Sequence, residues 1–108
     1  MNSVKLKRSF YTNPDTVGVA RALLGKKLVT RIDGKRAAGI ICETEAYCGT
    51  ADRGCHAYGG RFTDRTRIMY AEGGVSYVYI CYGIHHLFNV VTHVSGEPHA
   101  VLIRAIEV

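Results

Sequence analysis

Residues 28–47 read LVTRIDGKRAAGIICETEAY and carry the clearest structural signal in the chain. Asp33-Gly34 is a strong two-residue turn signal between predicted strands at residues 28–32 and about 36–47, so we expect an antiparallel hairpin. On its second strand, side-chain alternation turns one face acidic toward the strand end and gives the other face small, mostly apolar residues. These are the residues that we expect in the core: Ala38, Ile40, Cys42, Thr44 and Ala46.

The remaining sequence predicts one helix and a second group of strands. Asn13-Pro14-Asp15 begins a helix over about 14–24, which Gly25 would end. Residues 48–62 form a glycine-rich loop, and Thr63 is expected to cap a short helix to about residue 69. Apolar segments at 75–82, 87–94 and 100–108 predict an antiparallel meander. The fold class is therefore mixed α/β (α+β), a single domain with a mainly antiparallel sheet and few helices.

Length and composition favour one globular domain. The chain has 108 residues, 47% of them hydrophobic, and no run of about 18 apolar residues. Its basic N-terminus lacks the apolar run of an export signal, so we expect no membrane segment and an intracellular location with four reduced cysteines. That location would be the cytoplasm or nucleoid of a bacterium, or a eukaryotic nucleus.

Charge is divided unevenly along the sequence. The net charge is +5, but residues 1–36 carry nine basic and two acidic side chains, which leaves the remainder with a net charge of −2. Such a division suggests a surface that faces a polyanion beside a differently built site. A solvated basic surface without a partner is the alternative on charge alone.

Two carboxylates and one arginine are candidates for chemistry. Glu43 and Glu45 are two residues apart and share a strand face, as a tuned general base or an ordinary acidic strand end would. Arg104 interrupts an apolar strand face, so burial there would require an anionic partner, with Glu43 or Glu45 the candidate. A structural ion pair explains this pattern as well as catalysis does.

Asn89, His56 and the tyrosines could bind a ligand. Asn89 lies among apolar residues and must be either a hydrogen-bonded core amide or a reader of a ligand. Tyrosine offers a stacking face for an unpaired base, and Tyr82 directly before Gly83 would lie at a hairpin tip as a wedge. Cys48, Cys55 and His56 do not have zinc-ligand spacing, so we expect no metal.

Several pieces, in a fixed order and spacing, resemble the 3-methyladenine (alkyladenine, methylpurine) DNA glycosylase family. They are ETEAY at 43–47, His56, RFTDR at 61–65, YVYICYG at 77–83, Asn89 and VLIRA at 101–105. The likeness covers about residues 10–108, after a basic tail at 1–9, and corresponds to the first half or so of the family's usual catalytic domain. We therefore expect a glycosylase domain that is truncated at its C-terminus.

The resemblance implies a curved antiparallel sheet with a protruding β-hairpin that enters the DNA minor groove. It implies that Glu45 is the general base, that Arg104 helps to hold the attacking water and the sugar-phosphate, and that Tyr82 fills the gap left by the flipped nucleotide. Glu43 would be structural.

The same resemblance implies a pocket for the extruded base. Tyr47 and Tyr79 would stack on the base, His56 would stack and hydrogen-bond, and Asn89 would exclude purines with a 2-amino group. The implied partner is double-stranded DNA that contains alkylated purines, bound by a monomer without metal or cofactor.

The chemistry expected is hydrolysis that leaves an abasic site. No lysine follows Lys35, and enzymes that also cut the backbone usually form a Schiff base through an amine, so we expect a monofunctional enzyme. Two alternatives remain open. One is a non-catalytic nucleic-acid-binding fragment, and the other is a small structural domain with a satisfied Glu45–Arg104 pair.

Overall fold

The computed structural model describes residues 5–81 and 85–108. In this part of the chain, two α-helices and two short 3₁₀ helices accompany five strands, which confirms the mixed α/β class. The helices are α1 (Arg8–Tyr11), α2 (Thr16–Leu23), η1 (Tyr58–Gly60) and η2 (Arg67–Tyr70). The strands are β1 (Lys27–Ile32), β2 (Lys35–Cys48), β3 (Ser76–Cys81), β4 (His85–Thr92) and β5 (His99–Glu107). None of the described helices is long and apolar enough to cross a membrane.

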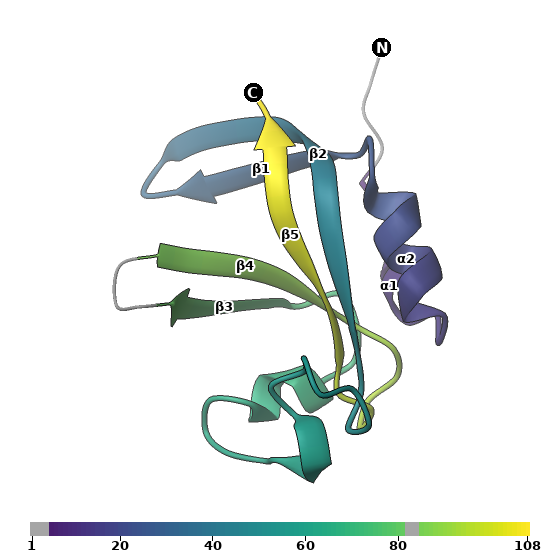
Figure 1. The fold of residues 1–108 in the computed structure, drawn as a ribbon. Helices are drawn as coiled ribbons and strands as arrows, with labels where there is room; N and C mark the ends of the chain where they lie inside the picture. Colours follow the sequence, from purple (N-terminus) through teal and green to yellow (C-terminus); the bar gives the residue numbers. More distant parts are fainter. Residues whose placement is uncertain (1–4, 82–84) are drawn as a thin grey trace.

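The strands form one antiparallel sheet in the order β1-β2-β5-β4-β3. Strands β3, β4 and β5 are neighbours in sequence and in space, so the predicted meander is confirmed. The sheet curls into a half-barrel in which the β1–β2 and β3–β4 hairpins project to the same side of β5 (Figure 1). Strand β5 is the central strand and connects the two hairpins.

The β1–β2 turn has the geometry that its sequence requires. Asp33 and Gly34 have φ values of 52° and 75°, both in the left-handed region. A two-residue hairpin turn that matches the twist of its strands needs positive φ at both positions, which Asp-Gly supplies at low cost. The predicted hairpin is therefore confirmed, with Arg31 directly opposite Arg36 and Ile32 opposite Lys35.

Helix α2 confirms the predicted helix and packs on one face of the sheet. The side chain of Asp15 caps it by accepting a hydrogen bond of 2.9 Å from the Gly18 backbone N–H. At the first turn, the Thr16 hydroxyl lies 2.9 Å from Nδ1 of His99 and 3.2 Å from the hydroxyl of Thr92. These buried contacts fix the start of the helix against β4 and β5.

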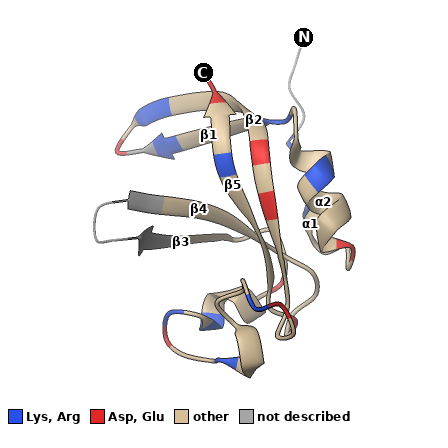
Figure 2. Ribbon diagram, in the orientation of Figure 1, with Lys and Arg blue, Asp and Glu red and all other residues tan. Residues whose placement is uncertain are grey.

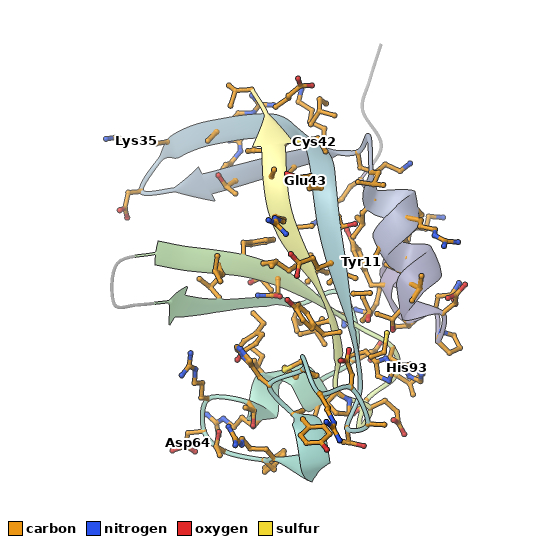
Figure 3. The ribbon with its side chains drawn as sticks, viewed as in Figure 1. Tyr11, Lys35, Cys42, Glu43, Asp64 and His93 are labelled. Carbon is orange, nitrogen blue, oxygen red and sulfur yellow. The ribbon has the colours of Figure 1, made fainter. Side chains whose placement is uncertain are left out.

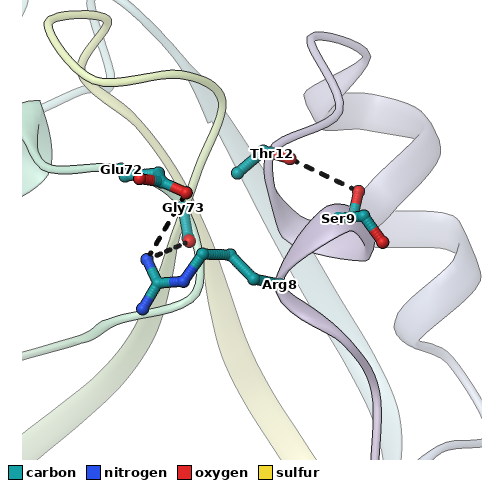
Figure 4. Close-up of polar contacts among 5 residues, drawn as sticks. All are labelled: Arg8, Ser9, Thr12, Glu72 and Gly73. Atoms are coloured by element: carbon teal, nitrogen blue, oxygen red, sulfur yellow. Dashed lines mark hydrogen bonds and ion pairs between the residues drawn. The ribbon is translucent and has the colours of Figure 1, made fainter.

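Helix α1 was not predicted, because a single turn has no periodicity of its own. Tertiary contacts hold it (Figure 4): Arg8 Nη1 donates a 3.1 Å hydrogen bond to the Gly73 carbonyl and lies 3.8 Å from a Glu72 carboxylate oxygen. A side chain at Gly73 would approach the Tyr11 carbonyl to 2.5 Å, so this close approach of two backbones requires glycine. The segment before β3 thus holds α1 in place.

Two hydrophobic clusters lie on opposite faces of the sheet. The first is centred on α2 and buries Val19, Ala20, Leu23, Ile41, Val101 and Ile103. The second lies beneath the β2–β3 connection and buries Cys55, Ala57, Met69, Tyr77, Val91 and Ala100. Strand β5 contributes to both, so its middle is buried on both faces.

A β-bulge corrects the predicted core face of β2. The β2–β5 register shifts between Ile41 and Glu43 and again between Glu43 and Thr44. Ile41 packs with α2, and Thr44 Oγ1 donates a 2.9 Å hydrogen bond to the Ala20 carbonyl of that helix. Odd and even residues therefore exchange faces at the bulge. The core prediction holds for Thr44 and Ala46 but is wrong for the earlier positions, since Ile40 is 42% exposed and Ile41 only 4%.

The long connection after β2 folds back over the second cluster through turns and the two 3₁₀ helices. The prediction that Thr63 caps a helix is wrong: its hydroxyl accepts a 3.2 Å hydrogen bond from the Thr66 N–H within a turn, and Thr66 is the N-cap of the next helix. The helix that follows is a 3₁₀ helix and begins only at Arg67. This connection forms one wall of the site described below.

Candidate active site

One row of residues crosses four strands on the sheet face opposite α2. Glu45 on β2 pairs with Leu102 on β5, Leu102 with Asn89 on β4, and Asn89 with Tyr77 on β3. Directly paired residues in antiparallel strands point to the same face. Four segments distant in sequence therefore bring their side chains to a common surface, and the half-barrel curls around it.

The Glu45 carboxylate is held by two hydrogen bonds, one to each oxygen. Tyr47 Oη donates to Oε1 at 2.8 Å, and Arg104 Nη1 donates to Oε2 at 2.9 Å. Strand geometry explains both contacts, since Tyr47 is two residues from Glu45, and Arg104 is two residues from Leu102, the partner of Glu45. The two donors leave each oxygen a lone pair with which to accept a proton from water.

The predicted anionic partner of Arg104 is therefore Glu45, but the pair is not buried. The side chains of Arg104 and Glu45 are 62% and 38% exposed. An exposed pair of this kind contributes at most about 1 kcal/mol to stability. The other carboxylate that was proposed as the partner of Arg104 is Glu43, which lies at the bulge and is exposed.

His56 lies in the connection after β2 and contacts the opposite end of the row. Its Nδ1 is 2.9 Å from Tyr77 Oη, and the two rings meet edge to face with centroids 5.9 Å apart. Burial lowers the pKa of His56, and the charges of Arg65 and then Arg61 lower it further. The ring is therefore neutral at pH 7 and can present a donor or an acceptor, according to its tautomer.

Asn89 is 2% exposed, and its Nδ2 donates a 3.2 Å hydrogen bond to the Tyr77 carbonyl. This confirms that the amide is buried and hydrogen-bonded. Asn89 also lines a cavity of about 30 Å³, together with Tyr47, Gly54, His56, Met69, Tyr77 and Ala100. A cavity of this size is large enough to hold water.

A larger hollow of about 450 Å³ adjoins this cavity, and His56 lines both. Its other lining residues are Arg61, Thr63, Arg65 and Thr66. Two arginines and two hydroxyl side chains are groups that bind anionic or polar ligands. His56 thus separates a small, tyrosine-lined cavity from a wider cationic hollow.

The structure brings five of the seven predicted site residues together. Glu45, Tyr47 and Arg104 form one hydrogen-bonded group, while Tyr47, His56 and Asn89 line the cavity, so Tyr47 belongs to both sets. The other two predictions, Tyr82 and the side chain of Tyr79, lie outside the described residues.

Tyr77 was missing from the predicted site, although the structure places its ring against His56 and its carbonyl against Asn89. The available signal was its alternation with Tyr79 on one strand face. Most strand tyrosines are packing residues, and Tyr77, at 4% exposed, serves that purpose as well.

The cysteines near the site have the character of packing groups. Burial raises the pKa of the Cys48 and Cys55 thiols, with Asp52 adding to the effect at both. Both are protonated at neutral pH, and Cys55 packs in the second cluster with its thiol 3.7 Å from the Pro98 carbonyl. A protonated, buried thiol is a poor metal ligand.

Comparison with known proteins gives a consistent result. The sequence profile of the family described as "Methylpurine-DNA glycosylase (MPG)" matches residues 9–108. Proteins named "Putative 3-methyladenine DNA glycosylase" are 56% identical over 101 residues in Chlamydia felis and 54% identical over 99 residues in Bacillus thuringiensis. These alignments cover 94% and 92% of this chain but 52% and 48% of the relatives, so the chain spans about half their length. Because the family profile covers nearly all of the sequence, the chain belongs to the methylpurine-DNA glycosylase family.

Proposed function

We propose that this chain acts on double-stranded DNA as a 3-methyladenine-type glycosylase, which hydrolyses the bond between an alkylated purine and its deoxyribose. The observation that carries the proposal is the Glu45 carboxylate, positioned by Tyr47 and Arg104 beside the cavity that His56 and Asn89 line. The family membership supplies the substrate class. We further propose that the chain acts as a monomer.

In the proposed reaction, Glu45 activates one water molecule. The water oxygen forms a bond to C1′ of the sugar while the C1′–N bond breaks, and Glu45 accepts the proton. The electron pair of the broken bond leaves with the base, and an alkylated purine that carries positive charge departs neutral. The carboxylate also stabilises the positive charge that develops on the sugar, and Arg104 keeps the carboxylate and the water in position.

The base must leave the helix before this reaction, because the glycosidic bond is inaccessible within the stack. We propose that Tyr82 wedges into the duplex and that Tyr47, Tyr79 and His56 hold the extruded base. Asn89 would exclude a 2-amino group from the base of the pocket. His56 lines both the cavity beside Asn89 and the wider hollow, so it lies where the extruded base would pass from one to the other.

The proposed reaction is monofunctional, because no lysine of this chain follows Lys35 to form a Schiff base near Glu45. Borohydride reduction during the reaction should therefore trap no covalent protein–DNA adduct. A trapped adduct would contradict hydrolysis by water.

The test of the proposed function is release of free 3-methyladenine from methylated duplex DNA, measured by chromatography, with gel retention of the same DNA by the same preparation. Release together with retention supports the proposal. Retention without release supports the second candidate, a non-catalytic nucleic-acid-binding fragment, which is favoured by the nine basic against two acidic side chains of residues 1–36. Neither release nor retention would reject both.

A further inference from the structure

The β1–β2 hairpin carries more positive charge than the proposed reaction uses. Residues 27–36 contain four basic side chains, Lys27, Arg31, Lys35 and Arg36, against the single acidic Asp33. All four are exposed, and Figure 2 shows basic residues on both strands of this hairpin. Lys35 extends outward at the end of the hairpin (Figure 3).

Two of these charges directly oppose each other. Arg31 on β1 is the register partner of Arg36 on β2. Like charges at directly opposite positions destabilise an antiparallel pair. Within the described part of the chain, neither guanidinium forms an ion pair or a side-chain hydrogen bond, so the repulsion is not relieved inside the molecule.

Arg31 and Arg36 lie on the same face of the sheet as the candidate active site. Leu28 packs with the α2 cluster, so Arg31, three residues farther along β1, points to the opposite face. Thr44 bonds to α2, so Glu45 points to that opposite face as well. Arg31, Arg36 and the Glu45–Arg104 pair therefore share one surface.

Protection of an exposed sheet edge is the other explanation for a basic strand. Strand β1 is at the edge of the sheet, and Lys27 and Arg31 would serve that purpose. At Arg36, β2 is also open on one side, because its pairing with β5 begins only at Ile40. Edge protection therefore accounts for a basic residue on each strand, but it does not account for placing the two like charges directly opposite each other.

We propose that the Arg31–Arg36 pair is a phosphate clamp that binds the backbone of duplex DNA on one arm beside the lesion. This inference rests on the proposed function for the identity of its partner. Arginine binds phosphate with paired hydrogen bonds, and a phosphate between the two guanidinium groups turns their repulsion into attraction for both. The clamp adds affinity without reading sequence, because backbone phosphates carry none.

The distance between the clamp and Glu45 limits how far from the lesion the contacted phosphates can lie. Arg36 is nine residues from Glu45 along β2, which at ~3.3 Å per residue is at most about 30 Å. Duplex DNA rises ~3.4 Å per base pair, so the contacted phosphates lie within about nine base pairs of the lesion, on one side only.

The test compares two double variants with equal loss of charge. Arg31→Ala/Arg36→Ala removes the clamp, and Arg21→Ala/Lys26→Ala removes two exposed charges from α2 and from the residue just before β1. Affinity for a duplex with an arm of about 12 base pairs on each side of the lesion is measured from 50 to 200 mM salt. Loss of the clamp should lower affinity at least about tenfold at 50 mM salt and reduce the salt-dependence slope by about 1 relative to the control, because one phosphate contact is lost.

Shortening the arms in turn locates the contact. Cutting one arm stepwise from about 12 to about two base pairs should weaken binding of the wild-type chain and of the control at the length where the contacted phosphate is lost, but should not produce this step in the clamp variant. Equal slopes for the two double variants, or equal sensitivity to arm length, would overturn the clamp. Melting curves monitor folding, and removal of the like-charge pair should leave the midpoint unchanged or slightly higher.

Base release, assayed separately at saturating DNA, distinguishes this inference from the proposed function. The clamp variant should keep the wild-type single-turnover rate, because neither arginine contacts Glu45. If the wild-type chain releases no base but the slopes differ as expected, the catalytic proposal fails and the clamp stands. If base is released and the slopes are equal, the clamp fails and the catalytic proposal stands.

Discussion

The two ends of the residue row that crosses the sheet are built in opposite ways. At one end, Glu45 and Arg104 are exposed, and their ion pair contributes little to stability. At the other, Asn89 and Tyr77 are buried at 2% and 4% exposure and are joined by a hydrogen bond. A substitution at the exposed end should therefore report on chemistry, and one at the buried end on folding.

The largest effect is expected at Glu45. Glu45→Gln keeps the size of the side chain but cannot accept a proton, so single-turnover release of 3-methyladenine should fall by about 10³-fold. The melting temperature and DNA retention should change little. Glu43→Gln is the matched control, because this exposed glutamate lies two residues away on the same strand. Equal activity of Glu45→Gln and Glu43→Gln would reject Glu45 as the base.

Arg104→Ala should separate positioning from stability. It removes the donor to Glu45 Oε2, and we expect base release to fall by about 100-fold, while the free energy of unfolding falls by less than about 1 kcal/mol. Arg104→Lys keeps the charge with fewer donors and should recover part of the rate. A marked loss of stability with unchanged release would instead identify a purely structural ion pair.

Asn89→Ala should show the reverse pattern. The buried Tyr77 carbonyl loses a donor and the cavity gains an apolar wall, so the free energy of unfolding should fall by about 1–3 kcal/mol in urea titrations. Ser76→Ala, at an exposed position on the neighbouring strand, provides the reference. If Asn89→Ala were as stable as Ser76→Ala, the Asn89–Tyr77 hydrogen bond would not stabilise the fold.

The smallest expected effect is a pH dependence of folding stability that comes from His56. Its folded-state pKa is lowered, first by burial and then by Arg65 and Arg61, so the unfolded chain takes up a proton before the folded one does. This contribution to stability is complete above pH ~6.5 and is lost as the pH falls below that value toward the lowered pKa. Arg65→Ala should raise the pKa of His56 in an NMR titration, whereas Arg67→Ala should not. An identical pKa in both variants would remove the assigned electrostatic cause.

Local signals in the sequence predicted much of the fold. Asp33-Gly34 specified its turn through backbone conformation, and Asp15, within the Asn13-Pro14-Asp15 signal, capped α2 through one side-chain contact. These features depend on few neighbouring residues. Helix α1 was missed because its stability comes from a segment distant in sequence, specifically from Glu72 and Gly73.

The partner of Arg104 was predicted, but the reason given for it was wrong. An arginine on an otherwise apolar strand was expected to need a carboxylate because of burial; Glu45 is its partner, yet the Arg104 side chain is 62% exposed. The bulge after Ile41 was not predictable, because an extra residue in a strand changes which side chains face the core without changing their hydropathy. The role of Tyr77 beside His56 likewise depends on how a loop folds back over the sheet.

The order of strands has a consequence for synthesis. Of the five described strands, β5 is the last to emerge from the ribosome, yet it is the central strand of the sheet. The β1–β2 and β3–β4 hairpins can each form while the chain is still growing, but nothing joins them until β5 inserts between them. Such late, non-local closure makes folding slow. A nascent chain that stops before β5 would carry Glu45 without Arg104, and so would have neither a closed sheet nor the proposed catalytic pair.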